Sequence, residues 1–451
     1  MKKSVDLTKG PVVEQLLKMA VPLAIGIFAV IGFNLVDTFF VSQLGTKELA
    51  AISLTFPVIS TLQSITMGLG AGLSSVVSRY KGAGRIGELK TIVSHSLIFA
   101  VVLVTVIACL GLITIDPLFR TIGASQDLLP LVRDYMEIWY FGIGFIVIPM
   151  MGNSAIRGLG DAVTPAVIMI IAGLVNAILD PILIFGLLGF PALGLKGAAL
   201  ATVISTTTTC VAAIYILARR EKIIDYNIPS FNSLFKSISI VLHVGIPAAF
   251  NQVSQPIALA LLISFVTVYG NEATAAFGIY IKIEAVLMIP LYATSSALGP
   301  FMGQNFGAGV FERLKLGYKY CSIFVVSYGL FICSLLFFFG SYFLLPFSSD
   351  VNVIKIGWSI LSVVGFSYVL QGLTLLSVSS FYSLGKPFPS FVLTMLRTLF
   401  LLVPTCWFLQ SQFALDGIFY GISTVNIFVA LLALYLMMMF FRKKLHLEKI
   451  R

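Results

Sequence analysis

Long apolar runs that carry almost no charge dominate the chain of 451 residues. Hydrophobic residues make up 58% of it and charged residues only 11%, against about 45–50% and about 25% in soluble domains. Such a sequence cannot cover a water-exposed surface. The runs are long enough to cross a bilayer as helices, and the alternating pattern of a membrane β-barrel is missing. We therefore predict an all-α polytopic membrane protein.

Breaks at Gly, Pro or clustered charge leave twelve runs of spanning length. The predicted spans are 14–41, 51–78, 91–115, 130–153, 164–187, 197–218, 237–267, 274–300, 315–340, 353–380, 388–411 and 416–441. An even number of spans places both termini on one side of the membrane. Of the 29 Lys and Arg, 22 fall on that side, five on the other and two within spans. Because basic residues accumulate in cytoplasmic loops, both termini are predicted to be cytoplasmic.

The basic residues thus account for the net charge of +10 as a topology signal, and no nucleic-acid partner is predicted. The five cysteines lie inside apolar runs with no spacing suited to metal ligation or disulfides. A Gly-x-Gly-x-x-Gly spacing at 82–87 lies in a cytoplasmic loop with no strand before it, so we interpret it as a turn. No nucleotide-binding or catalytic motif is found, so we predict no enzyme activity and no cofactor. Energy for pumping would then come from an ion gradient.

The chain repeats itself at an offset of 225 residues, where Pro22 falls on Pro247 and Gly45 on Gly270. Since each copy holds six spans, both copies insert with the same orientation. Parallel repeats of this kind are typical of transporters, in which the substrate path lies between the halves. The predicted domains are an N-terminal lobe (1–218), a cytoplasmic linker (219–236) and a C-terminal lobe (237–451).

The repeat also allows a comparison between equivalent positions, which we call mates. Where one position carries a residue that its mate lacks, the shared scaffold does not require that residue. Asp37 falls on Leu262 and Asp180 on Thr405. An ionised carboxylate inside an apolar run costs a few kcal/mol or more unless it is paired or hydrated. Asn176 lies one helical turn before Asp180, and together they offer ligands for H⁺ or Na⁺. The alternative is that both carboxyls are structural groups, either hydrogen-bonded or near a membrane face.

The C-terminal half contains three intramembrane charges, Lys282, Glu284 and Arg397. Residues two apart on a helix do not face each other, so Lys282 and Glu284 are poor partners. We expect Glu284 and Arg397 to pair between helices. Such a pair would either fix helix register or take part in the substrate path, and the sequence leaves both open.

Several motifs together resemble the multidrug and toxic compound extrusion (MATE) family over nearly the whole chain. They are Pro22 with Asn34-Leu-Val-Asp37, Arg157-Gly-Leu-Gly160-Asp161 with Pro165, Asn176-Ala-Ile-Leu-Asp180-Pro181, Gly197-Ala-Ala-Leu-Ala-Thr202 and Gly303-Gln-Asn-Phe-Gly-Ala-Gly309. The resemblance implies two pseudo-symmetric six-helix lobes forming a V. It also implies a monomer that exports small organic compounds, often cationic or amphipathic, in exchange for H⁺ or Na⁺.

Within the family, the branch resembling DinF binds its coupling ion in the N-terminal lobe. The matching positions are Asp37, Asn176, Asp180 and Thr202, with Asn34 and Asn153 as additional cavity residues. The branch resembling NorM instead carries a glutamate in the seventh span, where this chain has Gln255, and an aspartate in the tenth, which here lacks any carboxylate. No metal site is predicted apart from one for Na⁺. Pro22 is expected to let the first span bend.

The leading alternative function is a flippase for lipid-linked saccharides from the same wider superfamily. Such proteins usually have more spans and a strongly cationic cavity, whereas only Lys282 and Arg397 are available here. A membrane-embedded enzyme would need a nucleophile or metal ligands near the carboxylates, and none is found. The predicted location is the bacterial or archaeal cell (inner) membrane, in contact with its lipids.

The charge distribution makes a testable prediction about topology. A cysteine introduced as Asn227→Cys in the linker should resist impermeant thiol reagents in intact cells, because the linker is predicted to be cytoplasmic. Gln126→Cys, in a loop on the opposite side, should react readily. Ready labelling at position 227 would overturn the predicted orientation.

Overall fold

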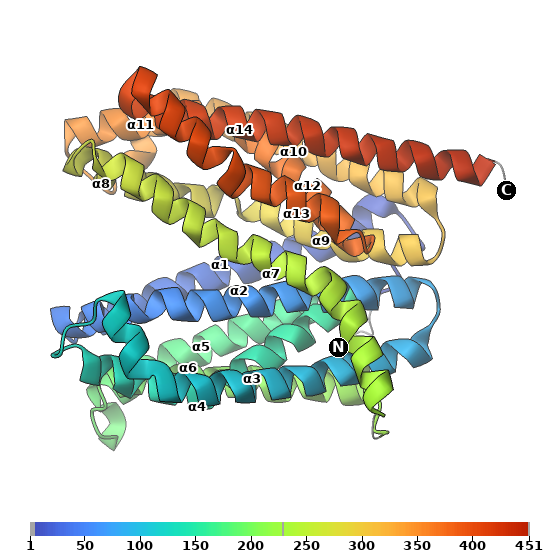
Figure 1. Ribbon diagram of the computed structural model, residues 1–451, viewed down its shortest axis with the longest axis horizontal. Coiled ribbons are helices and arrows are strands. Elements are labelled where there is room, and N and C mark those ends of the chain that lie inside the picture. The colour runs from blue at the N-terminus through green and yellow to red at the C-terminus, as the bar shows by residue number, and fades with distance from the viewer. Residues whose placement is uncertain (1–4, 228–229, 450–451) are drawn as a thin grey trace. The chain divides into compact units, whose positions relative to one another are not determined.

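The computed structural model describes residues 5–227 and 230–449, with side chains as far as residue 443. Within these residues the regular secondary structure is entirely helical (Figure 1). Helices satisfy their own backbone hydrogen bonds, which is required in hydrocarbon, where water is absent. The all-α prediction is confirmed.

The helices of the first half are α1 (Val12–Ser42), α2 (Thr46–Gly82), α3 (Ile86–Ile122), α4 (Leu129–Gly158), α5 (Val163–Phe185), the 3-10 helix η1 (Leu187–Gly189), α6 (Leu195–Tyr215) and the π-helical turn η2 (Ile216–Arg220). Those of the second half are α7 (Phe231–Thr267), α8 (Asn271–Leu287), α9 (Ile289–Gly307), α10 (Phe311–Leu344), α11 (Val351–Phe366), α12 (Tyr368–Ser383), α13 (Pro387–Met395), the π-helical turn η3 (Leu396–Phe400) and α14 (Leu402–Lys449).

Helix α14 contains a reversal that separates two spans. Ala414 has φ 51° and ψ −133°, outside the helical region. The sulfur of Cys406 lies 3.5 Å from the carbonyl oxygen of Ile418, although twelve residues of continuous helix would separate them by about 18 Å. The chain therefore turns back at Ala414, as expected between the eleventh and twelfth spans.

The number of spans follows from this reversal. The described chain has nine helical segments long and apolar enough to cross a membrane, or 11 when each of two bent pairs forms one span. The segment Pro387–Lys443 counts once in that number although it contains the reversal. Taking it as two spans raises the number from 11 to twelve, in agreement with the sequence.

Two predicted spans are sharply bent. The eighth bends by 44° between α8 and α9, and the tenth by 47° between α11 and α12. Pro290 lies just after the first break, where its missing N–H and its ring disfavour a continuous helix. At the second break Ser367 separates the two helices with no proline nearby.

The chain forms two compact units. Unit 1 comprises Met1–Asp6 and Ile25–Ile246, and unit 2 comprises Leu7–Ala24 and Pro247–Arg451. The start of α1 therefore belongs to unit 2, and the start of α7 to unit 1. Both boundaries lie within three residues of the repeat-related prolines Pro22 and Pro247.

An N-terminal segment is held tightly within unit 2. Leu7 is 1% exposed, and its N–H donates to Oε1 of Gln304 at 3.0 Å. Its carbonyl oxygen accepts from Nδ2 of Asn305 at 3.1 Å and from Nη2 of Arg313 at 3.2 Å. Arg313 also donates to the carbonyl oxygen of Gly10 at 2.8 Å. The Gly303–Gly309 motif thus fixes the segment that leads into α1.

The linker after η2 is attached to α3 in unit 1. The N–H of Asp225 donates to Oγ of Ser94 at 2.7 Å, and Thr91 donates to Oδ2 of Asp225 at 3.1 Å. The backbone N–H of Asn227, together with the Thr91 hydroxyl, holds the pKa of Asp225 below its ordinary value. A lowered pKa means that these contacts are complete near neutral pH and weaken as acid protonates the carboxylate.

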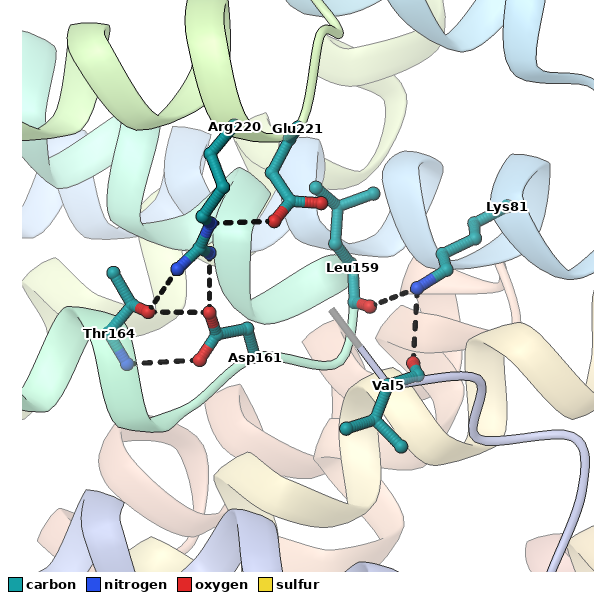
Figure 2. Close-up of polar contacts among 7 residues, drawn as sticks. All are labelled: Val5, Lys81, Leu159, Asp161, Thr164, Arg220 and Glu221. Atoms are coloured by element: carbon teal, nitrogen blue, oxygen red, sulfur yellow. Dashed lines mark hydrogen bonds and ion pairs between the residues drawn. The ribbon is translucent and has the colours of Figure 1, made fainter. Parts of the chain in front are cut away.

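A buried charge cluster fixes the start of α5 (Figure 2). Asp161 accepts from the N–H of Thr164 at 2.9 Å and from its hydroxyl at 2.6 Å. Arg220, at the end of η2, reaches Asp161 at 2.5 Å, Oγ1 of Thr164 at 2.7 Å and Glu221 at 2.8 Å. The side chains of Arg220, Asp161 and Glu221 are only 15%, 9% and 3% exposed.

Nearby, Lys81 of α2 donates to the carbonyl oxygens of Val5 and Leu159 (Figure 2). Leu159 lies in the connection between α4 and α5, two residues before Asp161. The ends of α2, α4, α5 and α6 are thereby joined through side-chain hydrogen bonds in unit 1.

Removing Arg220 should be costly. Arg220→Gln leaves two buried carboxylates without their shared cation, so we expect a loss of about 3–5 kcal/mol in the free energy of unfolding. Arg85→Gln is the matched control, because the Arg85–Glu88 pair is 52% and 56% exposed and such pairs contribute about 0–1 kcal/mol. Unfolding in detergent measures both, and equal losses would contradict a stabilising role for the cluster.

Candidate functional site

The site is built on the contact between α1 and α5, which run in the same direction within unit 1. A Cβ added at Gly26 would lie 3.3 Å from Ala166 Cβ, and one at Gly173 would lie 1.8 Å from the ring of Phe33. Further along, the rings of Phe40 and Phe185 are 6.3 Å apart. The contacts advance in the same direction along both helices, by seven residues on each from the first pair to the second. The two glycines let the backbones approach, which places Asp37 beside Asp180.

Asp37 and Asp180 face each other closely enough to interact directly. Asp180 is fully buried, and its Oδ2 has no hydrogen-bond partner among the described residues. Its Oδ1 accepts from Nδ2 of Asn176 at 3.2 Å. Two carboxylates this close repel each other when both are ionised, and a proton or a cation between them removes that repulsion.

The other predicted residues lie around this pair at varying distance. Asn153 of α4 is 8% exposed, and its Oδ1 also lacks a partner in the described chain. Thr202 is half-buried on α6, which packs against α5, and no contact joins its side chain to the carboxyls. Asn34 is exposed one turn before Asp37, and its carbonyl oxygen accepts from Thr38.

Tyr135 of α4 is a residue that the sequence analysis missed. It is 9% exposed and lies within electrostatic range of both Asp37 and Asp180. Its mate in the repeat is Ile360, so the comparison of mates that found the carboxylates would have found this tyrosine too. A phenolic hydroxyl can donate a hydrogen bond to a carboxylate and accept one from a carboxylic acid.

The oxygen atoms at this site are suitable ligands for a small cation. Two carboxyls, an amide and a phenol provide hard oxygen ligands, which suit H⁺ or Na⁺. No group of three or more His, Cys, Asp or Glu that could hold a metal occurs in the described part of the chain.

In unit 2 the expected direct pair between Glu284 and Arg397 is not formed. The two are within electrostatic range, but Nε of Arg397 donates to Oδ1 of Asn426 at 3.1 Å. Lys282 is exposed on α8 and forms no ion pair with any described residue. Tertiary packing orients Arg397 toward the amide rather than the carboxylate.

Comparison with known proteins identifies the family. The MatE family matches residues 22–182 and again 247–408, so the second match begins at the repeat offset of 225 residues. The chain belongs to the MATE family.

Individual MATE relatives cover almost the whole chain. The FAD transporter of Shewanella oneidensis is 34% identical over 97% of this chain and 96% of its own length. The multidrug export protein MepA of Staphylococcus aureus is 24% identical over 94% and 93%. The Vibrio cholerae MATE transporter VcmN, solved as a point mutant, has a TM-score of 0.89 at 25% identity, covering 96% of this chain and 97% of its own. These MATE relatives are transporters, so no catalytic activity is indicated.

The close approach of α1 and α5 can be tested without touching the carboxyls. Gly173→Ala should drive Phe33 away and lower stability by about 1–3 kcal/mol through overpacking. Gly278→Ala on α8 meets no atom within 4 Å and is the matched control. Thermal unfolding in detergent reports the difference. The double variant Gly173→Ala/Phe33→Leu should recover much of the loss, and no recovery would show that the two residues do not limit the contact.

Proposed function

We propose that this MATE transporter is a secondary active antiporter that exports organic compounds in exchange for H⁺ or Na⁺ by alternating access. The observation that carries the proposal is the Asp37–Asp180 pair, held between α1 and α5 with a buried carboxylate oxygen that has no partner in the described chain. Without a bound proton or cation this arrangement is unfavourable. Its occupancy should therefore change the packing of α1, which Pro22 leaves able to bend.

The coupling ion enters this proposal as a switch of charge. Ion binding from outside cancels one negative charge of the pair and lowers the cost of burying it, so the outer part of α1 can close on α5. Release toward the cytoplasm restores the charge and reverses the change. Substrate and ion must weaken each other's binding by the same factor, because coupling between two sites is reciprocal.

The substrates we propose are small organic compounds, cationic or amphipathic, as the multidrug relatives indicate. A second candidate is FAD or a related flavin nucleotide, which the 34% identity to the FAD transporter favours. The proposed setting is a bacterial or archaeal cell (inner) membrane with both termini cytoplasmic, and the protein working as a monomer among membrane lipids.

Efflux from proteoliposomes tests the proposal. Wild-type protein should move a fluorescent organic cation when a pH gradient alone or a Na⁺ gradient alone is imposed. Asp37→Asn and Asp180→Asn keep the shape of the side chain but remove its charge, so gradient-driven efflux should fall to background. Asp127→Asn, in an exposed loop, is the control and should transport normally.

Two results would contradict the proposal. Wild-type efflux rates in both site variants would show that the coupling ion does not bind at Asp37 and Asp180. If neither the pH gradient nor the Na⁺ gradient drives the cation or FAD through wild-type protein, the proposal of ion-coupled export is wrong.

A further inference from the structure

Three irregularities of the backbone in unit 2 carry polar or charged side chains. The eighth span breaks at Met288, one turn after Glu284, whose carbonyl oxygen accepts from the N–H of Met288 at 2.9 Å. The tenth breaks at Ser367, directly before Tyr368. Arg397 lies in the π-helical turn η3. Breaks and π turns inside membrane spans are tolerated where they line a cavity or are buried in protein, and they are frequent at functional sites.

The repeat shows that the shared scaffold does not require these irregularities. The mates of Met288, Ser367 and Arg397 are Gln63, Gly142 and Ala172, and they lie inside the continuous helices α2, α4 and α5. Unit 2 alone therefore departs from regular helix at these three places. A feature specific to one half needs an explanation specific to that half.

The side chains at these places form one network, which we call the Arg397 cluster: Tyr280, Glu284, Ser367, Tyr368, Arg397 and Asn426. Asn426 accepts from Nε of Arg397 at 3.1 Å and donates to Oγ of Ser367 at 2.9 Å. Tyr280 faces both the Glu284 carboxyl and the Tyr368 hydroxyl. The mates of Tyr280, Glu284 and Asn426 are Thr55, Ile59 and Ala201, so none of these groups is shared with the other half.

The cluster has hydrogen-bond donors left over. Arg397 uses only Nε, and neither of its Nη atoms bonds to a residue of the described chain. Tyr368 is 1% exposed, yet its hydroxyl has no hydrogen-bond partner at normal distance in that part of the chain. Arg397 and Glu284 are only half-buried, and the neighbouring Tyr292 is 41% exposed, so one side of the cluster is open. A guanidinium with a free fork is suited to a bidentate oxyanion.

We propose that the Arg397 cluster binds the phosphate group of a nucleotide-like substrate. The Nη atoms of Arg397 would hold two phosphate oxygens, and the Tyr368 hydroxyl would donate to a third. Glu284, the one acceptor with charge in the cluster, would bond to sugar hydroxyls or ring N–H groups of the same ligand. This deepens the second candidate of the proposed function, and it rests on the chain being an exporter of organic compounds.

The charge of Glu284 explains why the ligand should be of mixed character. A free oxyanion near Arg397 would meet the Glu284 carboxylate and be repelled, whereas a ligand with hydroxyl donors beside its phosphate gains a hydrogen bond there. A purely cationic drug would in turn be repelled by Arg397. The cluster therefore selects phosphate esters of polyhydroxylated compounds over simple anions and cations.

Flavins provide a matched set of probes, since FMN carries a phosphate that riboflavin lacks. Binding of each to the purified full-length protein in detergent can be followed by flavin fluorescence. We expect wild-type protein to bind FMN about tenfold or more tightly than riboflavin, as a charge-assisted fork of hydrogen bonds predicts. Arg397→Gln should abolish that preference and leave riboflavin binding unchanged. Arg397→Lys should restore only part of it, because Lys lacks the fork.

Two further variants guard against misfolding of the arginine variants. Tyr368→Phe removes one hydroxyl and should weaken FMN but not riboflavin. Glu284→Gln weakens the acceptor for the ribityl hydroxyls that FMN and riboflavin share, so it should weaken both flavins while the preference for FMN over riboflavin persists. Lys315→Gln, an exposed cation of the same unit, is the control for net charge and should change neither flavin.

Equal affinity of wild-type protein for FMN and riboflavin would overturn the phosphate site. So would a parallel loss of both flavins in Arg397→Gln and Tyr368→Phe, which would mean that the cluster only fixes helix register. This binding assay uses no ion gradient. If FMN is not preferred but gradient-driven efflux is normal, the phosphate site is rejected and the proposed function stands. If FMN is preferred but no gradient drives efflux, only the proposed export is rejected.

Discussion

The absence of water in the bilayer governs what this chain can place inside its spans. A backbone or side-chain polar group in hydrocarbon must find its partner within the protein. Most of the chain meets this requirement with regular helix, and Ser and Thr side chains add hydrogen bonds to carbonyl oxygens of the preceding turn, as Thr206 and Thr207 do on α6. The few groups left without a partner therefore stand out. Asp180, Asn153 and Tyr368 each keep one buried polar atom unpaired within the described residues.

The internal repeat turns this observation into a comparison between halves. Both copies share the glycines and prolines that let helices turn and pack, such as Gly45 and Gly270, which have φ of 144° and 102°. They differ in chemistry: unit 1 contains the carboxyl pair on the continuous helices α1 and α5, whereas unit 2 contains an arginine beside two broken spans. The scaffold is thus common to both halves, and the polar and charged residues inside the spans differ between them.

The length of the apolar runs and the breaks between them were enough to predict the spans, because a run inside a bilayer must satisfy its own backbone and does so as helix. Asp37 and Asn176 could be found because their mates Leu262 and Leu401 are apolar, and Asp180 because its mate Thr405 carries no carboxyl group. The breaks at Met288 and Ser367 were not predicted. Pro290 was a signal for the first, whereas no proline lies near Ser367. The π turn did leave a signal: Pro404 lacks the N–H that would bond the carbonyl of Phe400, the last residue of η3.

A transporter with an ion site in one unit and a substrate site in the other needs a physical connection between them. Helices α1 and α7 supply one, because each begins in one unit and ends in the other, with the change close to Pro22 or Pro247. Residues 12–24 of α1 belong to unit 2 and follow the segment anchored by Gln304, Asn305 and Arg313. If α1 moves against α5 when Asp37 changes charge, that movement would act on these residues. Coupling free energies between distinct sites are typically about 1–3 kcal/mol. Because α1 follows a segment anchored in unit 2 and carries Asp37 in unit 1, we expect any such coupling to pass along this helix.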